Sequence, residues 1–280
     1  MTAVLTWERA EDNERAYFSL LAQTPPVEGA AVLINPECPA LLINRAMSLR
    51  FPPDNLGTDL ARLEAPFLRH RIPPSVYLTP ASAPSGLRRV LMARGYRTEY
   101  RQTVMVYDLG ADGRVGVAGR EGPAGQAAAA GQAPAAGPAS APLQVLEAGR
   151  PAEYHAWCRV FLEGFEVPPD MHQVMYEMNL RSLRHPQVTG LLGVVDGEPV
   201  ATTCLFVEGD TAGLYAVSTI PKARRRGVAG AMVRRALDLA RAQGVTLAVL
   251  QTGTGGDPER LYRTLGFRDL FVAEVMTRHA

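Results

Sequence analysis

The stretch from Gly213 to Gln243, GLYAVSTIPKARRRGVAGAMVRRALDLARAQ, constrains the fold more than any other part of the chain. Its first part, Leu214 to Ile220, contains Tyr, Val and Thr and ends at Pro221, which is typical of a strand. From Val228 onward, apolar residues recur every three or four positions and predict a helix with one buried face. The stretch therefore predicts a strand, a cationic loop and a helix in succession.

The loop between these two elements carries positive charge where a helix start favours negative charge. Its cations are Lys222, Arg224, Arg225 and Arg226. A helix N-terminus has unpaired backbone N–H groups and about half a positive charge, and no Ser, Thr, Asn or Asp cap stands here. Gly227 and Gly230 leave the backbone uncovered, so we expect a bound anion, most simply a phosphate group. A solvated arginine-rich loop before a surface helix is the alternative.

The spacing Arg224-x-x-Gly227-x-Ala229-Gly230 differs from two common phosphate-binding motifs. The chain has neither a G-x-G-x-x-G after a strand nor a G-x-x-x-x-G-K-[ST] loop. The segment resembles motif A of the GNAT superfamily of N-acetyltransferases, whose [QR]-x-x-G-x-[GA] loop holds the pyrophosphate of acetyl-CoA.

The resemblance implies two ways of holding acetyl-CoA. The end of the strand would pair its backbone with the pantetheine arm, and the loop would offer backbone N–H groups to the pyrophosphate. A backbone N–H near Val217 would stabilise the oxyanion. The side chains of Arg225 and Arg226 either reach phosphate oxygens or remain solvated. The residues expected at acetyl-CoA are Val217, Ser218, Thr219, Arg224, Arg225, Arg226, Gly227, Val228, Ala229 and Gly230.

A second segment resembles motif B of the same family. Val245 to Gln251 is an apolar run typical of a strand, and Glu259 to Phe267 predicts a short helix with Gly266 as its left-handed cap. Tyr262 matches the family tyrosine near the CoA sulfur, which implies a general acid, because a phenol of pKa near 10 can protonate a thiolate of pKa roughly 8.5. An aromatic residue packed at a helix end is the alternative. The Asn common in the family seven positions earlier is Gly255 here, so no amide contact is expected there.

Composition excludes several other kinds of protein. The chain has 280 residues, a net charge of +1 and 47% hydrophobic residues, which is typical of a soluble protein long enough for two domains. Near-zero net charge and the lack of a long apolar run argue against nucleic-acid or membrane binding, and we expect a cytoplasmic location. The three cysteines and five histidines are scattered without ligand spacing, so neither a disulfide framework nor a metal site is predicted.

The chain divides into three parts by composition. Residues 111–142 are dominated by Ala, Gly and Pro and predict a flexible linker. Residues 143–280 carry both family motifs and are expected to form the catalytic domain. Residues 1–110 predict an α/β domain, and Gly95-Tyr-Arg-x6-Val-Met recurs as Gly266-Phe-Arg-x6-Val-Met. We therefore expect α/β (α+β) architecture of the GNAT type, a mostly antiparallel sheet flanked by helices, in two tandem lobes, the first degenerate and walling the substrate side. An unrelated α/β scaffold is the alternative for residues 1–110.

Secondary structure follows from periodicity along both parts. In the first part, helices are predicted over 9–22, 54–70 and 85–94, and strands over 40–49, 76–78 and 98–107. In the second part, helices are predicted over 152–165 and 171–184, and strands over 143–146, 189–195 and 198–207. Met171, Met175, Tyr176 and Met178 either line an acceptor pocket or belong to the core.

The function predicted from these features is acetyl transfer from acetyl-CoA to a primary amine by direct attack in a ternary complex. The general base is unassigned, because the central strand has no acidic residue. Small amines, amino acids, antibiotics, peptide N-termini and lysine side chains are all compatible acceptors, and the oligomeric state is open. A non-catalytic acyl-CoA sensor or interaction module is the alternative. A nucleic-acid patch at the cationic loop is a weaker one, since the loop lacks aromatic partners.

Overall fold

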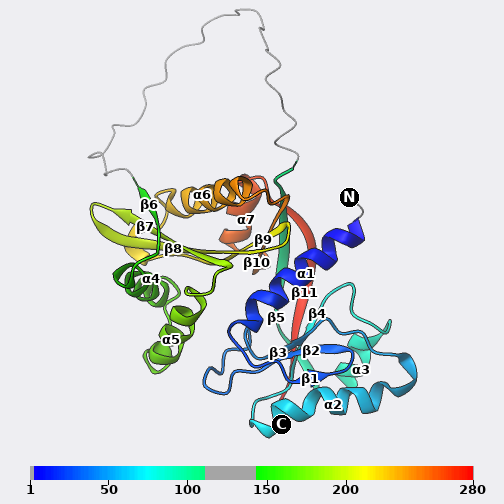
Figure 1. Ribbon diagram of the computed structural model, residues 1–280. Helices are drawn as coiled ribbons and strands as arrows, with labels where there is room; N and C mark the ends of the chain where they lie inside the picture. Colours follow the sequence, from blue (N-terminus) through cyan, green and yellow to red (C-terminus); the bar gives the residue numbers. More distant parts are fainter. Residues whose placement is uncertain (1–2, 111–142, 280) are drawn as a thin grey trace, which may run out of the picture.

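The computed structural model describes residues 3–110 and 143–279. These residues build one eleven-stranded sheet in the order β1-β2-β3-β4-β11-β5-β10-β9-β8-β7-β6, flanked by helices (Figure 1). Most neighbouring strands are antiparallel, and among the described strands only the pairs β3–β4 and β9–β10 are parallel. The predicted class, a mixed and mostly antiparallel α/β sheet with helices on its faces, is confirmed.

The first part of the chain supplies the strands at one end of the sheet. Its elements are α1 (Ala3–Ser19), β1 (Pro26–Val27), β2 (Ala30–Leu33), β3 (Arg45–Met47), α2 (Leu56–Arg69), β4 (Ser75–Leu78), α3 (Leu87–Ala93) and β5 (Tyr96–Asp108). A 3₁₀ turn, η1 (Pro53–Asn55), precedes α2.

The second part supplies the other end. Its elements are β6 (Gln144–Glu147), α4 (Pro151–Gly164), α5 (His172–Ser182), β7 (Val188–Val195), β8 (Glu198–Glu208), β9 (Thr211–Thr219), α6 (Val228–Ala242), β10 (Leu247–Gly253), α7 (Asp257–Thr264) and β11 (Arg268–Arg278). The 3₁₀ turns η3 (Pro169–Met171) and η4 (Pro221–Ala223) precede α5 and α6.

The strand predicted over residues 40–49 is mostly wrong. The backbone N–H groups of Ile43 and Asn44 both donate to the Ala40 carbonyl at 3.0 Å, which closes a turn. The Asn44 side chain strengthens this turn by donating to the same carbonyl at 3.1 Å, as turn asparagines often do. A strand therefore begins only at Arg45, and the sequence reading also missed the short strands β1 and β2.

The two parts of the chain exchange strands at the centre of the sheet. Strand β5 lies between β10 and β11, and β11 lies between β4 and β5 (Figure 1). The repeat noticed in the sequence falls on these two strands: Gly95 and Gly266, both with positive φ, precede β5 and β11. The predicted linker, residues 111–142, lies outside the described residues. The parts of the chain before and after it contribute their strands to one continuous sheet.

The pairing of β5 with β11 is symmetric about its middle. Arg97 pairs with Thr277, and Arg268 pairs with Val106. The spacing from Arg97 to Arg268 equals that from Val106 to Thr277, so exchanging the two repeats converts one pair into the other. Two related halves would produce this register, and the tandem arrangement stays a prediction.

The main core draws on both parts of the chain. Tyr17, Met47 and Met105 belong to the same buried cluster as Trp157 and Phe206. Trp157 is 1% exposed, and burying an aromatic side chain of this size stabilises the fold by about 3 kcal/mol. A smaller cluster, including Phe67 and Leu91, lies around α2, α3 and β4. Helices α4 and α6 cover opposite faces of β7–β9 (Figure 1).

Candidate active site

A cleft opens where β9 and β10 diverge. The two strands pair in parallel only over Thr211–Gly213 and Leu247–Val249, and the described strands have no further pairing with each other. The cleft that begins there has a volume of about 650 Å³ and is lined by Leu214, Tyr215, Ala216 and Val217 of β9 and by Gln251, Thr252 and Gly253 of β10. The edge of β9 is therefore available to an extended ligand, which could add to it through backbone hydrogen bonds.

A β-bulge distorts β9 within this cleft. Opposite the two-residue step from Thr202 to Cys204 of β8, β9 makes a three-residue step from Ser218 to Tyr215. Ala216 takes up the extra residue with a φ of 51°. The Ala216 carbonyl accepts from the Thr202 hydroxyl at 2.8 Å. The bulge takes one residue out of the ladder next to Val217. This is where the sequence reading placed the oxyanion N–H.

Tyr262 reaches the cleft from α7. It is 6% exposed, and burial raises the pKa of its phenol to about 12. Its ring meets Phe267 edge to face at 5.9 Å, and among the described residues no side chain or backbone group hydrogen-bonds its hydroxyl. The phenol is thus protonated over the working pH range of most enzymes and free to donate.

Strand β5 fixes the helix that carries Tyr262. The Thr103 hydroxyl of β5 donates to the Glu259 carboxylate of α7 at 2.8 Å. The same carboxylate accepts from Arg263 at 2.7 Å and from the Gly255 backbone. The position of the candidate acid therefore depends on a strand from the first part of the chain.

The loop before α6 has the geometry of an open anion site. Gly227 precedes the helix with φ +77° and caps it without a side-chain hydrogen bond. Residues Val228, Ala229 and Gly230 form the first turn, whose N–H groups have no carbonyl partner within the helix. A Cβ on Gly227 would meet nothing within 4 Å, so the glycine serves its backbone angle rather than the packing of the protein itself.

The arginines of this loop divide into two kinds. Arg224 is held by the protein: it donates to the Thr219 carbonyl at 3.0 Å and the Gly164 carbonyl at 2.9 Å and pairs with Glu166 at 2.8 Å. Arg225 and Arg226 are exposed and form no ion pair within the described residues. The guanidinium of Arg224 thus anchors the loop, whereas the other two are free to meet an anion.

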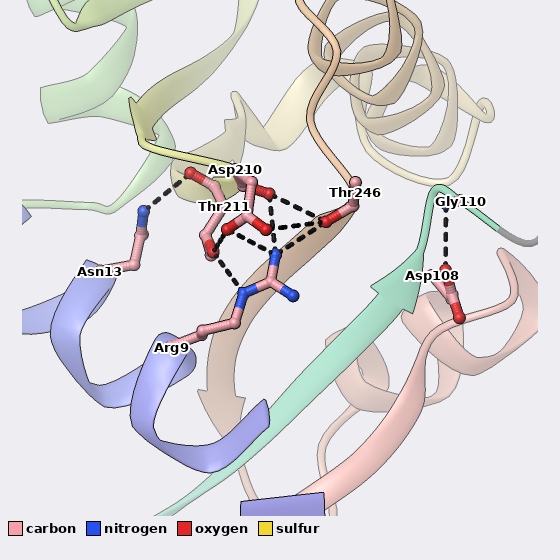
Figure 2. Close-up of polar contacts among 7 residues, drawn as sticks. All are labelled: Arg9, Asn13, Asp108, Gly110, Asp210, Thr211 and Thr246. Carbon is pink, nitrogen blue, oxygen red and sulfur yellow. Dashed lines mark hydrogen bonds and ion pairs between the residues drawn. The ribbon is translucent and has the colours of Figure 1, made fainter. Parts of the chain in front are cut away.

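Helix α1 joins the second part of the chain at the start of β9 (Figure 2). Arg9 pairs with the Asp210 carboxylate at 2.9 Å and donates to the Thr211 and Thr246 hydroxyls at 3.0 and 2.9 Å. Asn13 donates to the Thr211 carbonyl at 3.2 Å. These contacts set the next turns of α1, with Glu14, Tyr17 and Phe18, against the cleft.

Close approach of α1 to β9 explains a glycine in the strand. A Cβ at Gly213 would lie 2.2 Å from the Asn13 Oδ1 atom, so any larger residue would push the helix away. The Asn13 oxygen instead accepts a hydrogen bond from the Tyr215 hydroxyl at 2.9 Å, and Tyr215 stacks on Tyr17 with ring centroids 3.8 Å apart. The first part of the chain is thereby fitted to the cleft side of β9.

Glu14 supplies the carboxylate among the described residues that line the cleft. It is buried, accepts from Arg45 at 2.6 Å and from the Tyr77 hydroxyl at 3.1 Å. Burial raises the pKa of Glu14 above its ordinary value, although the Arg45 guanidinium opposes that shift. The sequence prediction missed this residue, yet Glu14 shares one face of α1 with Tyr17 and Phe18, and an acidic residue inside an apolar stripe was the available signal.

The structure places the predicted site residues in different surroundings. Val217 and Tyr262 line the cleft, whereas the Ser218 hydroxyl lies within 2.8 Å of the Thr202 hydroxyl and the Thr219 carbonyl accepts from Arg224. The loop residues 224–230 follow the end of β9 and do not line the described cleft.

The proposed acceptor residues are only partly together. Met171, Met175 and Met178 line the cleft. Tyr176 does not, because it faces the other way and contacts His155. No group of three or more His, Cys, Asp or Glu that could hold a metal occurs within the described ranges, and none of the described helices is both long and apolar enough to cross a bilayer.

Comparison with known proteins assigns one region of the chain to a family. Residues 153–267 match the family model of the Acetyltransferase (GNAT) family. These residues form a GNAT acetyltransferase domain. The match spans α4 to the residue before β11 and therefore includes the cleft strands, the α6 loop and Tyr262. No curated relative matches the sequence.

Solved structures, two of them of GCN5-related N-acetyltransferases, share the fold over nearly the whole chain. A GCN5-related N-acetyltransferase from Kribbella flavida has 20% identity and a TM-score of 0.65, covering 97% of this chain and 96% of that one. A GCN5-related N-acetyltransferase from Sphaerobacter thermophilus has 19% identity and a TM-score of 0.62, covering 89% and 75%. A functionally unknown conserved protein from Staphylococcus epidermidis has 9% identity and a TM-score of 0.62, covering 92% and 94%.

The GNAT domain fits the acetyl-CoA that its family uses. The open edge of β9 suits an extended pantetheine arm, and the uncapped first turn of α6 suits a pyrophosphate. When bound, acetyl-CoA supplies an acetyl group activated as a thioester.

Proposed function

We propose that this protein transfers the acetyl group of acetyl-CoA to a primary amine, which attacks the thioester directly in a ternary complex. The observation that carries the proposal is the cleft itself: the open, bulged edge of β9 and the protonated phenol of Tyr262 line one cavity. The names of the Kribbella and Sphaerobacter proteins, both N-acetyltransferases, support nitrogen as the acceptor atom.

Each group has a role in this proposal. Val217, Ser218 and Thr219 hold the pantetheine arm through their backbone, with a backbone N–H near Val217 stabilising the oxyanion. Backbone N–H groups from Arg224 to Gly230 hold the pyrophosphate, with the Arg225 and Arg226 side chains adding charge. Tyr262 donates its proton to the departing thiolate. Glu14, the carboxylate that lines the cleft, is the candidate general base, although it already forms an ion pair with Arg45.

Residues 1–110 wall the substrate side of the cleft in this proposal, as a lobe without its own acetyl-CoA loop. The supporting observations are the cleft residues contributed by α1, by the segment 39–43 and by Gln102 of β5. Residues 143–280 are the catalytic part.

The proposal is tested by thermal-shift titration with acetyl-CoA, CoA and ATP, using Gly227→Asp as the loop variant. A ligand at about 100 times its Kd stabilises the fold by roughly 2.7 kcal/mol. We expect acetyl-CoA to stabilise the native protein and Gly227→Asp to abolish the shift, since the variant places negative charge where the pyrophosphate binds.

Gly244→Asp is the matched control. Gly244 has φ +76°, and a Cβ there also meets nothing within 4 Å, so the substitution adds the same charge and the same backbone strain at the other end of α6. Acetyl-CoA should still stabilise this variant. An absence of any shift with every CoA species would overturn the donor site and favour a different role for the loop.

A further inference from the structure

Two apolar segments form the outer wall of the cleft, one from each part of the chain. Segment 39–43 contributes Pro39, Ala40, Leu42 and Ile43, and segment 165–171 contributes Phe165, Val167, Pro168 and Met171. Leu42 is 39% exposed and Phe165 is 48% exposed, although both are large and hydrophobic. Exposed apolar side chains gathered at a cleft mark a surface that binds an apolar group.

Segment 39–43 is held in place before any ligand arrives. Buried Asn44 donates to the Ala40 carbonyl at 3.1 Å and accepts from the Asn35 N–H at 2.7 Å. The neighbouring Cys38 sulfur lies 3.5 Å from the Met175 sulfur of α5. Leu42 therefore sits on a turn fixed against the opposite wall, so binding there requires little ordering of the protein.

The charges of the cleft exclude several classes of acceptor. Among the described lining residues there is no Lys, Arg or His, and Glu14 is the carboxylate. An acceptor that carries its own carboxylate, such as an amino acid, would find no cation. An acceptor with several ammonium groups would bring them against apolar walls and one carboxylate that Arg45 already neutralises at 2.6 Å.

The shortage of hydrogen-bonding groups disfavours a peptide. The side-chain amides that line the described cleft belong to Gln102, Asn179 and Gln251. Asn179 donates to Met175 of its own helix at 2.7 Å, and Gln102 accepts from Arg45 at 3.4 Å. The buried Gln251 Nε2 atom has no hydrogen-bond partner among the described residues, so it can satisfy one ligand acceptor but not a run of peptide groups. Peptide N–H and C=O groups buried along segments 39–43 and 165–171 would lack partners, at a cost of about 1–3 kcal/mol each.

We propose that the acceptor is a small primary amine carried on a single uncharged, apolar body. The body lies between Leu42 and Phe165 and against Met171 and Met175, while the amine points inward toward Tyr262. This inference rests on the proposed function and adds the chemical class of the acceptor and the residues that select it.

A homologous series of amines tests the acceptor class. We would measure kcat/KM for primary alkylamines from propylamine to nonylamine by thiol release from acetyl-CoA, with spermidine, glycine and a tripeptide as polar acceptors. Each methylene that enters the apolar wall should raise kcat/KM by about fourfold until the cleft is full. A flat series, or better turnover of any polar acceptor than of octylamine, would overturn the inference.

Two variants at the mouth test the selecting residues. Leu42→Gln and Phe165→Gln should each lower kcat/KM for octylamine by about tenfold more than kcat/KM for propylamine. Leu68→Gln is the control, because Leu68 is 52% exposed on α2 and does not line the cleft. Equal loss for short and long amines, or the same loss in Leu68→Gln, would contradict a selecting role.

Calorimetry separates this inference from the proposed function. Acetyl-CoA binding is measured on the same preparation, and the Kd of each alkylamine is measured with CoA present. Acetyl-CoA binding together with preference for polar amines would retain the function and overturn the inference. Absence of acetyl-CoA binding and turnover would overturn the function and, with it, the inference about the acceptor.

Discussion

Tyr262 is the candidate catalytic residue whose surroundings the structure defines most sharply. Its ring packs on Phe267 and its hydroxyl has no protein partner among the described residues, so Tyr262→Phe removes the proton donor and little else. We expect kcat to fall roughly 100-fold while acetyl-CoA affinity and thermal stability stay nearly unchanged. Steady-state kinetics with calorimetry and thermal unfolding provide the measurement. Unchanged turnover would remove Tyr262 from the mechanism.

The pH profile is the second readout for Tyr262. Burial raises the pKa of this phenol to about 12, so the acidic form persists where an ordinary tyrosine of pKa near 10 would ionise. The native enzyme should therefore show no loss of kcat between about pH 9 and pH 10.5 within the stability range of the fold. A fall with an apparent pKa near 10 would mean that ligand binding returns the phenol to an ordinary environment.

Arg225 and Arg226 form a second prediction at this scale. Both are exposed and unpaired in the described chain, whereas Arg224 is used to hold the loop. The double variant Arg225→Gln/Arg226→Gln should weaken acetyl-CoA binding by about tenfold and reduce its salt dependence. Titration calorimetry at two salt concentrations measures both effects.

Arg69→Gln/Arg268→Gln is the control for that experiment. Both residues are exposed, neither has an ion pair within the described residues, and their loss changes the net charge equally. The control should bind acetyl-CoA as the native protein does. Equal weakening in both double variants would mean that net charge, rather than local contact, governs binding.

At the scale of elements, α1 connects the first part of the chain to the cleft side of β9. Asn13→Ala removes the acceptor of the Tyr215 hydroxyl and the donor to the Thr211 carbonyl. We expect the free energy of unfolding to fall by about 1–3 kcal/mol, because both partners are buried. We also expect the acceptor KM to rise with little change in acetyl-CoA affinity, as measured by urea unfolding and steady-state kinetics.

Asp12→Ala controls for the change of helix sequence. Asp12 is exposed on the same helix, and its one ion pair within the described ranges is with Arg15, one turn away. Its loss should change stability and KM only slightly. If Asn13→Ala raised the acetyl-CoA Kd as much as the acceptor KM, α1 would position the whole cleft and not one side of it.

The elements of the GNAT domain were predictable because their signals are local. The α6 loop, the helix after it and the α7 motif depend on residues adjacent in sequence, and each was found in the expected place. The turn at Ala40 was missed because Asn44 competes with the strand through its side chain. Glu14 was missed because its importance comes from contact with Arg45 and Tyr77, and no spacing within α1 reveals such partners.

At the scale of the whole molecule, strand exchange was beyond sequence reasoning. The repeat after Gly95 and Gly266 was visible, but the pairing of the two repeats with each other depends on the sheet. Composition predicted two parts separated by a linker, whereas strands from the two parts alternate at the centre of the sheet. Of the four residues predicted to line an acceptor pocket, the three methionines line the cleft and Tyr176 does not, since helix spacing alone does not say which side Tyr176 faces.

Buried tyrosines make the stability of the whole fold sensitive to alkali. Burial raises the pKa values of Tyr17, Tyr77 and Tyr215 well above their usual range. Above about pH 10 the unfolded chain loses these protons and the folded chain keeps them, so unfolding becomes easier as pH rises. Each such tyrosine contributes about 1.4 kcal/mol per pH unit to the fall in unfolding free energy.

Urea unfolding at several pH values from neutral to about pH 11 measures this slope. Tyr17→Phe is the informative variant, since it keeps the ring stacked on Tyr215 and removes one titrating group. Above about pH 10, the unfolding free energy of the variant should fall less steeply with pH than that of the native protein, by about 1.4 kcal/mol per pH unit. Parallel curves for the variant and the native protein would show that Tyr17 ionises freely in the folded state.

The central position of β11 also bears on how the protein is made. As the nascent chain leaves the ribosome, β4 and β5 emerge well before residues 268–278, the strand that separates them in the finished sheet. Until then β4 and β5 each present an unmatched edge, of the kind that invites pairing with a neighbouring chain. The first part of the chain therefore lacks a neighbouring strand until synthesis of the GNAT domain is nearly complete. During this interval a chaperone would find exposed strand edges to protect.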